Sequence, residues 1–519
     1  MTGEPTDAPA WDLTPTATYV EGLRRGLLRF LRCDACARAF FYPRVLCPNC
    51  GSAALHWEES RGGGVVYSVT EVFPKDAEPY NICLVDVQEG FRMATTVLGG
   101  DTGDRNAGAL RCGELGRRRA ATGLRHRRAR IVSAGASLRG KVAVVGIGES
   151  DIGDLGPDRL SIDLLGQATV EALADAGLAK DSIDGLWSNV GTTMSNLDVA
   201  EYLGLRPRYS GGAMVGGSSF VSHLYHAAVA IASGEIETAL IAYGSASRAA
   251  RSRLGFRRSG VSEEYSYEGP FKLMAPASQY ALAAARHMYE FGTTREQIAD
   301  VAVASRQWAA LNPRAFTKKP LTREDVITSR IMSTPLTVRD CCLVTDGGAA
   351  LVLTSAERAK DLPRPPAYVL GAGEAHWHRQ ISQMPDLTTT AAVDSGARAF
   401  AMAGLAPGDV DVVQLYDAFT INAILFLEDL GFCAKGEGGA FVADGGIAPG
   451  GHLPVNTNGG GISYTHPGMY GLFLMTEAVR QVRGEAPAQV PGVDVALAHG
   501  NGGYLSSQVT ALFGSQATL

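Results

Sequence analysis

The chain has 519 residues, of which 46% are hydrophobic and 19% charged, so it has the composition of an ordinary globular protein and is too long for a single core. A formal net charge of −6 argues against a nucleic-acid partner, and we expect neither a leader sequence nor a membrane-spanning run. Nine cysteines, four of them in a metal-binding pattern, favour a reducing, cytoplasmic location over a disulfide scaffold.

The N-terminal region begins with a Thr-, Pro- and Asp-rich stretch, residues 1–18, which we expect to be a flexible tail. The basic amphipathic segment Tyr19–Leu31 predicts a helix. Two Cys-x-x-Cys pairs follow, and their spacing predicts a structural zinc ribbon with a closed tetrahedral site. The expected zinc ligands are Cys33, Cys36, Cys47 and Cys50.

Three segments with strand character come next: Gly64–Val72, Tyr80–Val87 and Phe91–Val97. A zinc ribbon followed by a small β-barrel, here residues 19–100, resembles the zinc-ribbon/OB-fold family that associates with acyl-CoA and partners thiolase-like enzymes. The resemblance breaks down in the following segment, residues 101–139. It is rich in arginine and lacks strand-like alternation, which is typical of a solvated linker. A reading-frame error in the gene would scramble the composition in the same way, and both explanations stay open.

The remainder of the chain contains an internal repeat. Ala176–Asp184 is echoed by Ala403–Asp411, and each copy follows an Ala-rich helix and precedes an apolar strand. Two copies of one βα unit predict two similar halves, residues 140–360 and 361–519, packed against each other. A polar insertion, residues 246–335, separates them and holds two expected helices, Ala277–Phe291 and Thr294–Leu311.

A glycine-rich run, Asn456–Gly468, is the most informative motif of the second half. Three consecutive glycines allow the backbone to approach a ligand closely, and Tyr464 and His466 follow before an apolar helix. A packed glycine-rich turn would have the same local composition. The run resembles the thiolase signature of a Gly-rich loop and a catalytic histidine, and further matches lie at His499-Gly500-Asn501 and around Cys341-Cys342. The resemblance implies a duplicated, five-layered αβαβα thiolase fold that forms a homodimer.

Both catalytic cysteines of a thiolase are missing from this sequence. Ser218 stands where the resemblance places the nucleophile, and His499 stands where it places the second cysteine. Gly216-x-Ser218-x-Phe220 lacks the second glycine of a nucleophile elbow, which argues against a serine nucleophile. We expect the small side chain of Ser218 to leave room for substrate instead. Cys341 and Cys342 precede a strand, and we expect them to be structural.

Lipid-transfer-protein-like aldolases of steroid side-chain degradation are thiolase relatives that dispense with these cysteines. The segment Tyr416-Asp417-Ala418-Phe419-Thr420 and Tyr464 resemble the two tyrosine motifs of that class. The resemblance implies retro-aldol cleavage of a branched β-hydroxyacyl-CoA, with Tyr416, Tyr464 and His466 as the catalytic residues. The expected substrate and oxyanion contacts are Ser218, Asp417, Gly460, His499 and Asn501.

Two alternatives stay open: a thiolase or acyltransferase with an unrecognised nucleophile, and a non-catalytic acyl-CoA-binding scaffold. The expected cofactors are structural zinc and coenzyme A as part of the substrate. An enoyl-CoA hydratase, which makes β-hydroxyacyl-CoA, is an expected partner.

Overall fold

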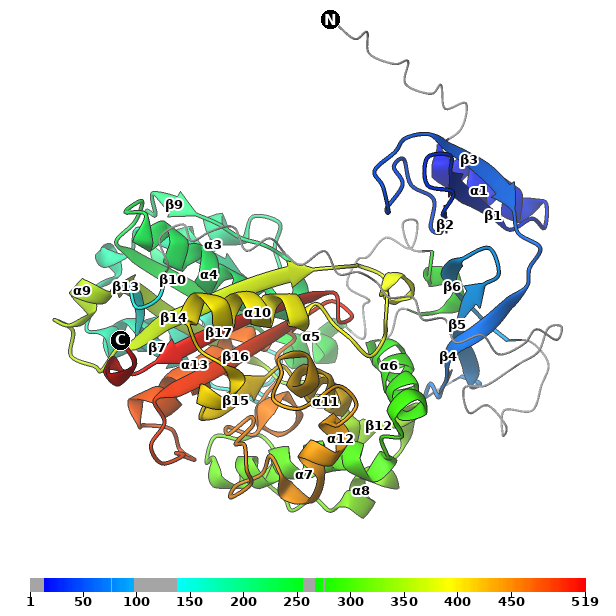
Figure 1. The fold of residues 1–519 in the computed structure, drawn as a ribbon. Helices are drawn as coiled ribbons and strands as arrows, with labels where there is room; N and C mark the ends of the chain where they lie inside the picture. The colour runs from blue at the N-terminus through cyan, green and yellow to red at the C-terminus, as the bar shows by residue number, and fades with distance from the viewer. Residues whose placement is uncertain (1–13, 76, 98–137, 255–266, 274–275) are drawn as a thin grey trace, which may run out of the picture.

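The computed structural model describes residues 14–75, 77–97, 138–254, 267–273 and 276–519. Most of the expected tail and nearly all of the arginine-rich segment 101–139 therefore lie outside the described residues. Figure 1 shows the N-terminal elements on one flank of a large α/β core, next to helix α6 (Pro276–Phe291).

The first helix differs from the expected boundaries, and the zinc-ribbon sheet begins within the segment predicted to be helical. Helix α1 (Pro15–Arg24) begins after Thr14, whose hydroxyl accepts a hydrogen bond from the backbone N–H of Ala17. The expected helix Tyr19–Leu31 is wrong at both ends, because Gly26 turns the chain with a φ of 73° and strand β1 (Arg29–Cys33) begins soon afterwards. β1 lies between the two other strands of a small sheet, β2 (Ala39–Phe40) and β3 (Leu55–Glu59).

The second N-terminal sheet contains strands from two distant parts of the chain. The predicted strands are present as β4 (Gly64–Val72), β5 (Tyr80–Val87) and β6 (Phe91–Thr95). Two short strands of the insertion, β11 (Ile331–Ser333) and β12 (Leu336–Thr337), extend this sheet in the order β12-β11-β4-β5-β6. The described residues form an open five-stranded sheet, and the segment 98–137, where further barrel strands were expected, lies outside them.

The α/β core is organised around a nine-stranded sheet in the order β15-β16-β17-β14-β7-β13-β10-β8-β9. The two halves join where β7 pairs with β14. The strands are β7 (Val142–Glu149), β8 (Gly185–Asn189), β9 (Tyr209–Ser210), β10 (Thr238–Ser245), β13 (Gly347–Ser355), β14 (Ala367–His376), β15 (Val412–Leu415), β16 (Val495–Gly502) and β17 (Ser507–Gly514).

Each half of this sheet is covered by its own helices, and two further helices contact both halves. α2 (Ser161–Ala176) covers strands of the first half and α10 (Ala392–Ala403) covers strands of the second half. α4 (Ser219–Ala232) and α13 (Gly471–Arg483) contact each other and strands of both halves. The other helices are α3 (Ser195–Leu203), α5 (Ser247–Leu254), α7 (Arg295–Leu311), α8 (Arg323–Ile327), α9 (Ala356–Ala359), α11 (Thr420–Asp429) and α12 (Gly438–Val442).

The repeated sequence folds the same way twice. α2 and α10 each end at a glycine in the left-handed conformation, Gly177 with φ 66° and Gly404 with φ 65°. A short 3₁₀ turn and a strand, β8 or β15, follow in both halves. The inference of an internal duplication is thereby confirmed at the level of backbone conformation.

The two helices expected in the insertion are also confirmed, as α6 and α7. Thr294 caps α7 by accepting a hydrogen bond from the backbone N–H of Gln297. No helix among the described residues is long and apolar enough to span a bilayer.

Candidate functional site

The four expected zinc ligands lie together in the N-terminal part. Their Sγ atoms all lie within 4.8 Å of one another. Each Cys-x-x-Cys pair forms the same turn, in which the carbonyl of the first cysteine accepts from a backbone N–H four residues later: Ala37 bonds Cys33, and Gly51 bonds Cys47. A closed set of four thiolates fits a structural zinc ion and supplies no open position for catalysis.

The centre of the candidate active site is a pair formed by Tyr416 and His466. Tyr416 directly follows β15, and its Oη lies 3.0 Å from Nε2 of His466. The backbone N–H of Tyr470 donates to the same Oη at 3.2 Å, so the phenolic hydrogen is free to point at the imidazole. The rings of Tyr416 and His466 meet edge to face, with centroids 5.6 Å apart.

Burial sets the protonation states of this pair. It raises the pKa of Tyr416 well above the usual value of a phenol. It lowers the pKa of His466 to about 4. The resting pair is therefore a neutral phenol that donates to a neutral imidazole, and not the tyrosinate that a simple general base would require.

Asp417 lies beside the pair but is engaged with the glycine-rich loop. Its carboxylate accepts from the backbone N–H of Gly461 at 2.6 Å and from that of Ile462 at 3.4 Å. A Cβ on Gly460 would lie 2.1 Å from Oδ2 of Asp417, so only glycine permits this approach. Burial raises the pKa of Asp417 to about 7, although the backbone hydrogen bonds oppose the increase. The contacts of Asp417 and Gly460 thus hold the loop.

Tyr464 projects into a different buried cluster. Its hydroxyl donates to Glu149 at 2.7 Å, and Arg480 and Arg314 also contact this carboxylate. Burial alone would raise the pKa of Glu149, but the two guanidinium groups hold it below its usual range. Among the described contacts, the hydroxyl of Tyr464 does not meet the Tyr416–His466 pair.

Ser218 lies next to Tyr416 at the start of α4. A Cβ on Gly217 would lie 2.3 Å from the Tyr416 ring, which shows how closely this turn approaches the phenol. The buried hydroxyl of Ser218 lies 2.7 Å from that of Ser507 and 3.2 Å from the carbonyl of Val215. Among the described residues no histidine forms a hydrogen bond with the hydroxyl of Ser218.

His499 and Asn501 lie on β16 and belong to one hydrogen-bonded chain. The ring nitrogens of His499 lie 2.9 Å from Thr510 Oγ1 and 2.9 Å from Gln508 Oε1, and burial lowers the pKa of His499 to about 3. The side-chain amide of Gln508 donates to Asn501 Oδ1, and Asn501 donates to Tyr280 Oη at 2.7 Å. The backbone carbonyl of His499 accepts from the N–H of Tyr416, which places this chain beside the candidate catalytic pair.

The cysteine pair packs against the same region. The backbone N–H of Cys342 donates to the carbonyl of Ala418, and Cys341 forms a β-bridge with Phe419. Burial raises the pKa of Cys341 to about 12, which makes its thiolate scarce at neutral pH.

Sequence reasoning missed Tyr280 and Tyr470. Tyr470 contributes its backbone N–H to Tyr416, and its ring stacks on that of His466 with centroids 6.2 Å apart. Tyr470 lies six residues past Tyr464, at the start of α13, and carries no motif of its own. Tyr280 comes from the insertion, and no local pattern connects it to β16.

A separate cavity of about 710 Å³ opens between α7 and the loop 443–452. Arg323 lines it but is paired with Asp300 and Asp444, so its charge is already balanced. No residue of the Tyr416 cluster lines this cavity.

Known protein families match both the zinc ribbon and the α/β core of this chain. Residues 373–515 match the family "Thiolase C-terminal domain-like", and residues 20–56 match "ChsH2, rubredoxin-like zinc ribbon domain". A steroid side-chain-cleaving aldolase of Thermomonospora curvata is 37% identical over 382 residues, 68% of this chain and 93% of the relative. A 17-hydroxy-3-oxo-4-pregnene-20-carboxyl-CoA lyase of Mycobacterium tuberculosis is 37% identical over 387 residues, 69% of this chain and 96% of the relative.

Two further similarities concern a different activity and a solved structure. An acetyl-CoA acetyltransferase of Methanothermobacter thermautotrophicus is 35% identical and covers 72% of this chain and 99% of the relative. The structure described as the Ltp2-ChsH2(DUF35) aldolase superposes with a TM-score of 0.68 at 35% identity, over 74% of this chain and all of the other. The chain belongs to the thiolase-like family of the sterol-carrier and lipid-transfer-protein type, and it carries an N-terminal ChsH2-type zinc ribbon.

Proposed function

We propose that this protein cleaves a branched β-hydroxyacyl-CoA by a retro-aldol reaction, releasing a ketone or aldehyde and acetyl- or propionyl-CoA. The proposed acyl group is a steroid or alicyclic side chain, in keeping with the relatives that are 37% identical. The observation that carries the proposal is the buried Tyr416–His466 pair, which supplies a proton relay next to Ser218, the residue that the thiolase resemblance places at the nucleophile position. Chemistry at this site therefore has no cysteine nucleophile to use at the position of Ser218.

The proposed reaction moves one proton inward and back again. The β-hydroxyl gives its proton to Oη of Tyr416 while Tyr416 gives its own proton to Nε2 of His466. The electron pair of the broken O–H bond forms the new C=O bond, the Cα–Cβ bond breaks, and its electrons form the thioester enolate. The proton held by His466 then returns through Tyr416 to Cα, so protons balance. A relay suits this pair because neither a tyrosinate nor an imidazolium is stable there at rest.

The decisive experiment is incubation of the protein with a branched β-hydroxyacyl-CoA in the absence of free CoA. We expect release of a carbonyl compound and a shorter acyl-CoA in equal amounts. A strict requirement for free CoA would point to thiolysis and would refute the retro-aldol proposal.

A second candidate function is acyl transfer, which the acetyltransferase relative favours. It needs a covalent acyl-enzyme, and Cys342 is the thiol whose backbone touches the segment after Tyr416. The mass of the intact protein after incubation with acyl-CoA distinguishes the two functions. An acyl adduct lost in Cys342→Ala would support transfer, whereas a scaffold would show neither an adduct nor turnover.

The pH profile of cleavage should reflect the low pKa of His466. Because that pKa lies at about 4, the imidazole stays neutral and able to accept a proton well below pH 6.5. We expect kcat to stay level from pH 8 to about pH 5.5. A histidine with an ordinary pKa of ~6.5 would be mostly protonated at pH 5.5, and kcat would already be about tenfold lower. The measurement is kcat at saturating substrate, within the pH range where circular dichroism shows an intact fold. Asp417, whose pKa is about 7, holds the loop and carries no proton in the relay, so an inflection near pH 6.5 that persists in Asp417→Asn would contradict the assignment of His466.

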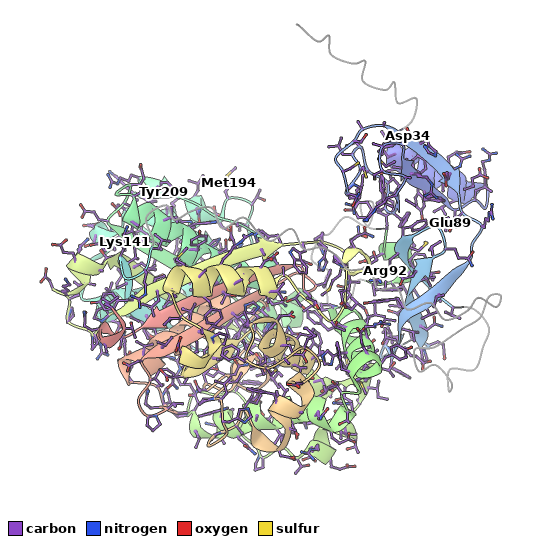
Figure 2. All side chains as sticks on the ribbon, viewed as in Figure 1. Asp34, Glu89, Arg92, Lys141, Met194 and Tyr209 are labelled. Carbon is purple, nitrogen blue, oxygen red and sulfur yellow. The ribbon has the colours of Figure 1, made fainter. Side chains whose placement is uncertain are left out.

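We also propose that the protein acts as a homodimer and receives its substrate from an enoyl-CoA hydratase. Apolar side chains are exposed on one flank of the core: Met194, which directly precedes α3, lies near Tyr209 of the sheet-edge strand β9 (Figure 2), and Leu197 of α3 is also exposed. Light scattering should give twice the chain mass of 54.6 kDa. A monomer at micromolar concentration would refute the dimer.

A further inference from the structure

Tyr280 joins two segments of the proposed active site that are far apart in sequence. Its fully buried Oη accepts from the Asn501 amide at 2.7 Å and donates to the carbonyl of Gly503 at 3.1 Å. Its ring stacks on Phe419, with centroids 4.5 Å apart and an interplanar angle of 27°. Tyr280 therefore touches both the turn that carries Tyr416 and the end of β16.

The hydrogen bonds around Tyr280 all run in one direction. Nε2 of His499 donates to Gln508, Gln508 donates to Oδ1 of Asn501, and Asn501 donates to Tyr280, which donates to Gly503. Neutral His499 can donate from Nε2 because Thr510 can donate to its other ring nitrogen. The polarity of this chain fixes which end of the Asn501 amide carries the nitrogen. That nitrogen has a second hydrogen besides the one given to Tyr280.

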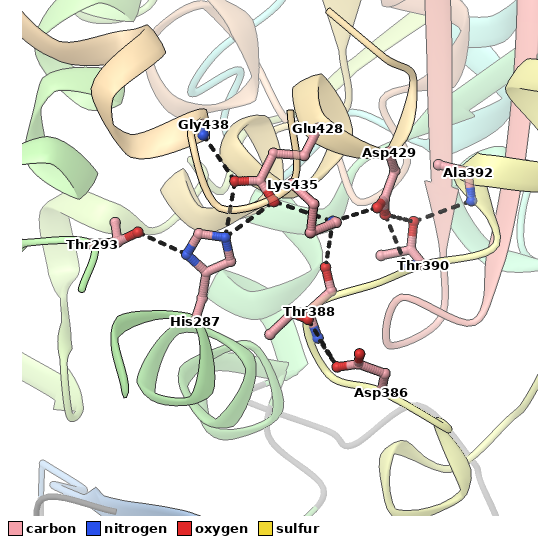
Figure 3. A network of polar contacts seen from close by, with 10 residues as sticks. All are labelled: His287, Thr293, Asp386, Thr388, Thr390, Ala392, Glu428, Asp429, Lys435 and Gly438. Atoms are coloured by element: carbon pink, nitrogen blue, oxygen red, sulfur yellow. Dashed lines mark hydrogen bonds and ion pairs between the residues drawn. The ribbon is translucent and has the colours of Figure 1, made fainter. Parts of the chain in front are cut away.

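Helix α6, which carries Tyr280, is anchored on two sides. On one side His287 bonds the buried Glu428 at 3.0 Å, and Lys435 contacts both Glu428 and Asp429 (Figure 3). On the other side Ser68 of β4 donates to the carbonyl of Leu282 at 2.7 Å. Because this helix is held in place on both sides, the Tyr280 side chain can fix the position of its hydrogen-bond partner, the Asn501 amide.

We propose that Tyr280 is a positioning residue for the retro-aldol reaction, an inference that rests on the proposed function. It orients the Asn501 amide so that its second N–H donates to the thioester oxygen as the enolate forms. Asn501 lies on the strand whose His499 carbonyl bonds the N–H of Tyr416, so the donor and the proton relay share one framework. Without the Tyr280 hydroxyl, the Asn501 amide loses its hydrogen-bond acceptor, and its second N–H is no longer held toward the thioester oxygen.

The test is a double-mutant cycle of Tyr280→Phe and Asn501→Ala. Tyr280→Phe keeps the ring stacked on Phe419, so we expect kcat to fall about tenfold and KM to change less than twofold. Asn501→Ala removes an oxyanion donor and should lower kcat by roughly 10²–10³-fold. If Tyr280 acts through Asn501, the double variant is no slower than Asn501→Ala alone. If the fold-decreases in kcat of the two single variants multiply in the double variant, the proposal is overturned.

A matched control and a measurement without substrate separate this inference from the proposed function. Tyr368→Phe removes another buried hydroxyl, which donates to Gln516 away from the site, and it should leave kcat unchanged. Hydrogen–deuterium exchange of residues 499–505 should accelerate in Tyr280→Phe and stay unchanged in Tyr368→Phe. Failure of the unaltered protein to cleave any β-hydroxyacyl-CoA would count against the proposed function. Unchanged exchange in Tyr280→Phe would overturn the role of Tyr280, whatever the reaction.

Discussion

Tyr416→Phe is expected to lower kcat by roughly 10²–10⁴-fold, the usual contribution of general acid–base catalysis. The variant keeps the ring that packs against Gly217 and removes only the hydroxyl that links the substrate to His466. KM should change little, because binding of the CoA portion does not depend on this proton relay. Steady-state kinetics with a branched β-hydroxyacyl-CoA give both quantities.

Two variants serve as controls for this loss. Tyr464→Phe removes an equally buried hydroxyl, but one that donates to Glu149, and we expect it to reduce stability by about 1–3 kcal/mol and kcat by less than tenfold. Ser218→Ala should also cost less than about tenfold, because we assign this serine no covalent step. An inactive Ser218→Ala enzyme beside an active Tyr416→Phe enzyme would show that the residues, and with them the reaction, are wrongly assigned.

Cys33→Ser is expected to abolish stoichiometric zinc binding and to unfold the ribbon at a much lower temperature. Structural zinc sites bind with roughly 10–16 kcal/mol in isolated peptides, and that free energy is available to the folded ribbon only while all four thiolates are present. Elemental analysis should show about one zinc ion per chain before the change and far less after it. Cleavage by the core should largely survive, because Cys33, Cys36 and Cys47 pack in a hydrophobic cluster separate from the one that contains Tyr416.

Cys83→Ser is the matched control, since Cys83 is a buried cysteine of β5 that lies outside the metal cluster. It should leave the zinc content unchanged. Protein that contains no zinc in its unaltered form, or Cys33→Ser protein that keeps its full zinc content, would contradict the assignment of the four ligands.

Short-range patterns predicted a large part of this fold. The Cys-x-x-Cys pairs meet as expected, β4 and β5 have the predicted bounds, and Thr294 caps α7. Each of these features is decided by residues within about twenty positions of one another, so the sequence carries the information locally. The repeated Ala-Gly-Leu segments predicted the two helix ends for the same reason, because a glycine in the left-handed conformation ends each helix.

Long-range partners account for what the sequence could not predict. Tyr464 has a motif that resembles a catalytic one, yet its hydroxyl bonds Glu149, 315 positions away. Asn501 depends on Tyr280, 221 positions away, and no spacing rule connects the two. Asp417 was expected among the substrate and oxyanion contacts, and its carboxylate accepts the backbone N–H of Gly461, 44 positions away. Tertiary packing decides which of several polar side chains remains available for chemistry.

The sheet that joins β4 to β11 has a consequence for how this protein behaves on dilution. Val72 pairs with Ser333, so an N-terminal strand and a strand of the core insertion complete one another within a single chain. Docking of the two parts is therefore a unimolecular equilibrium whose position does not depend on protein concentration. A free zinc-ribbon protein added in trans would have to compete with a tethered strand that never diffuses away. Dilution should consequently leave β4 paired with β11, whereas a zinc ribbon on a separate chain would dissociate from the core.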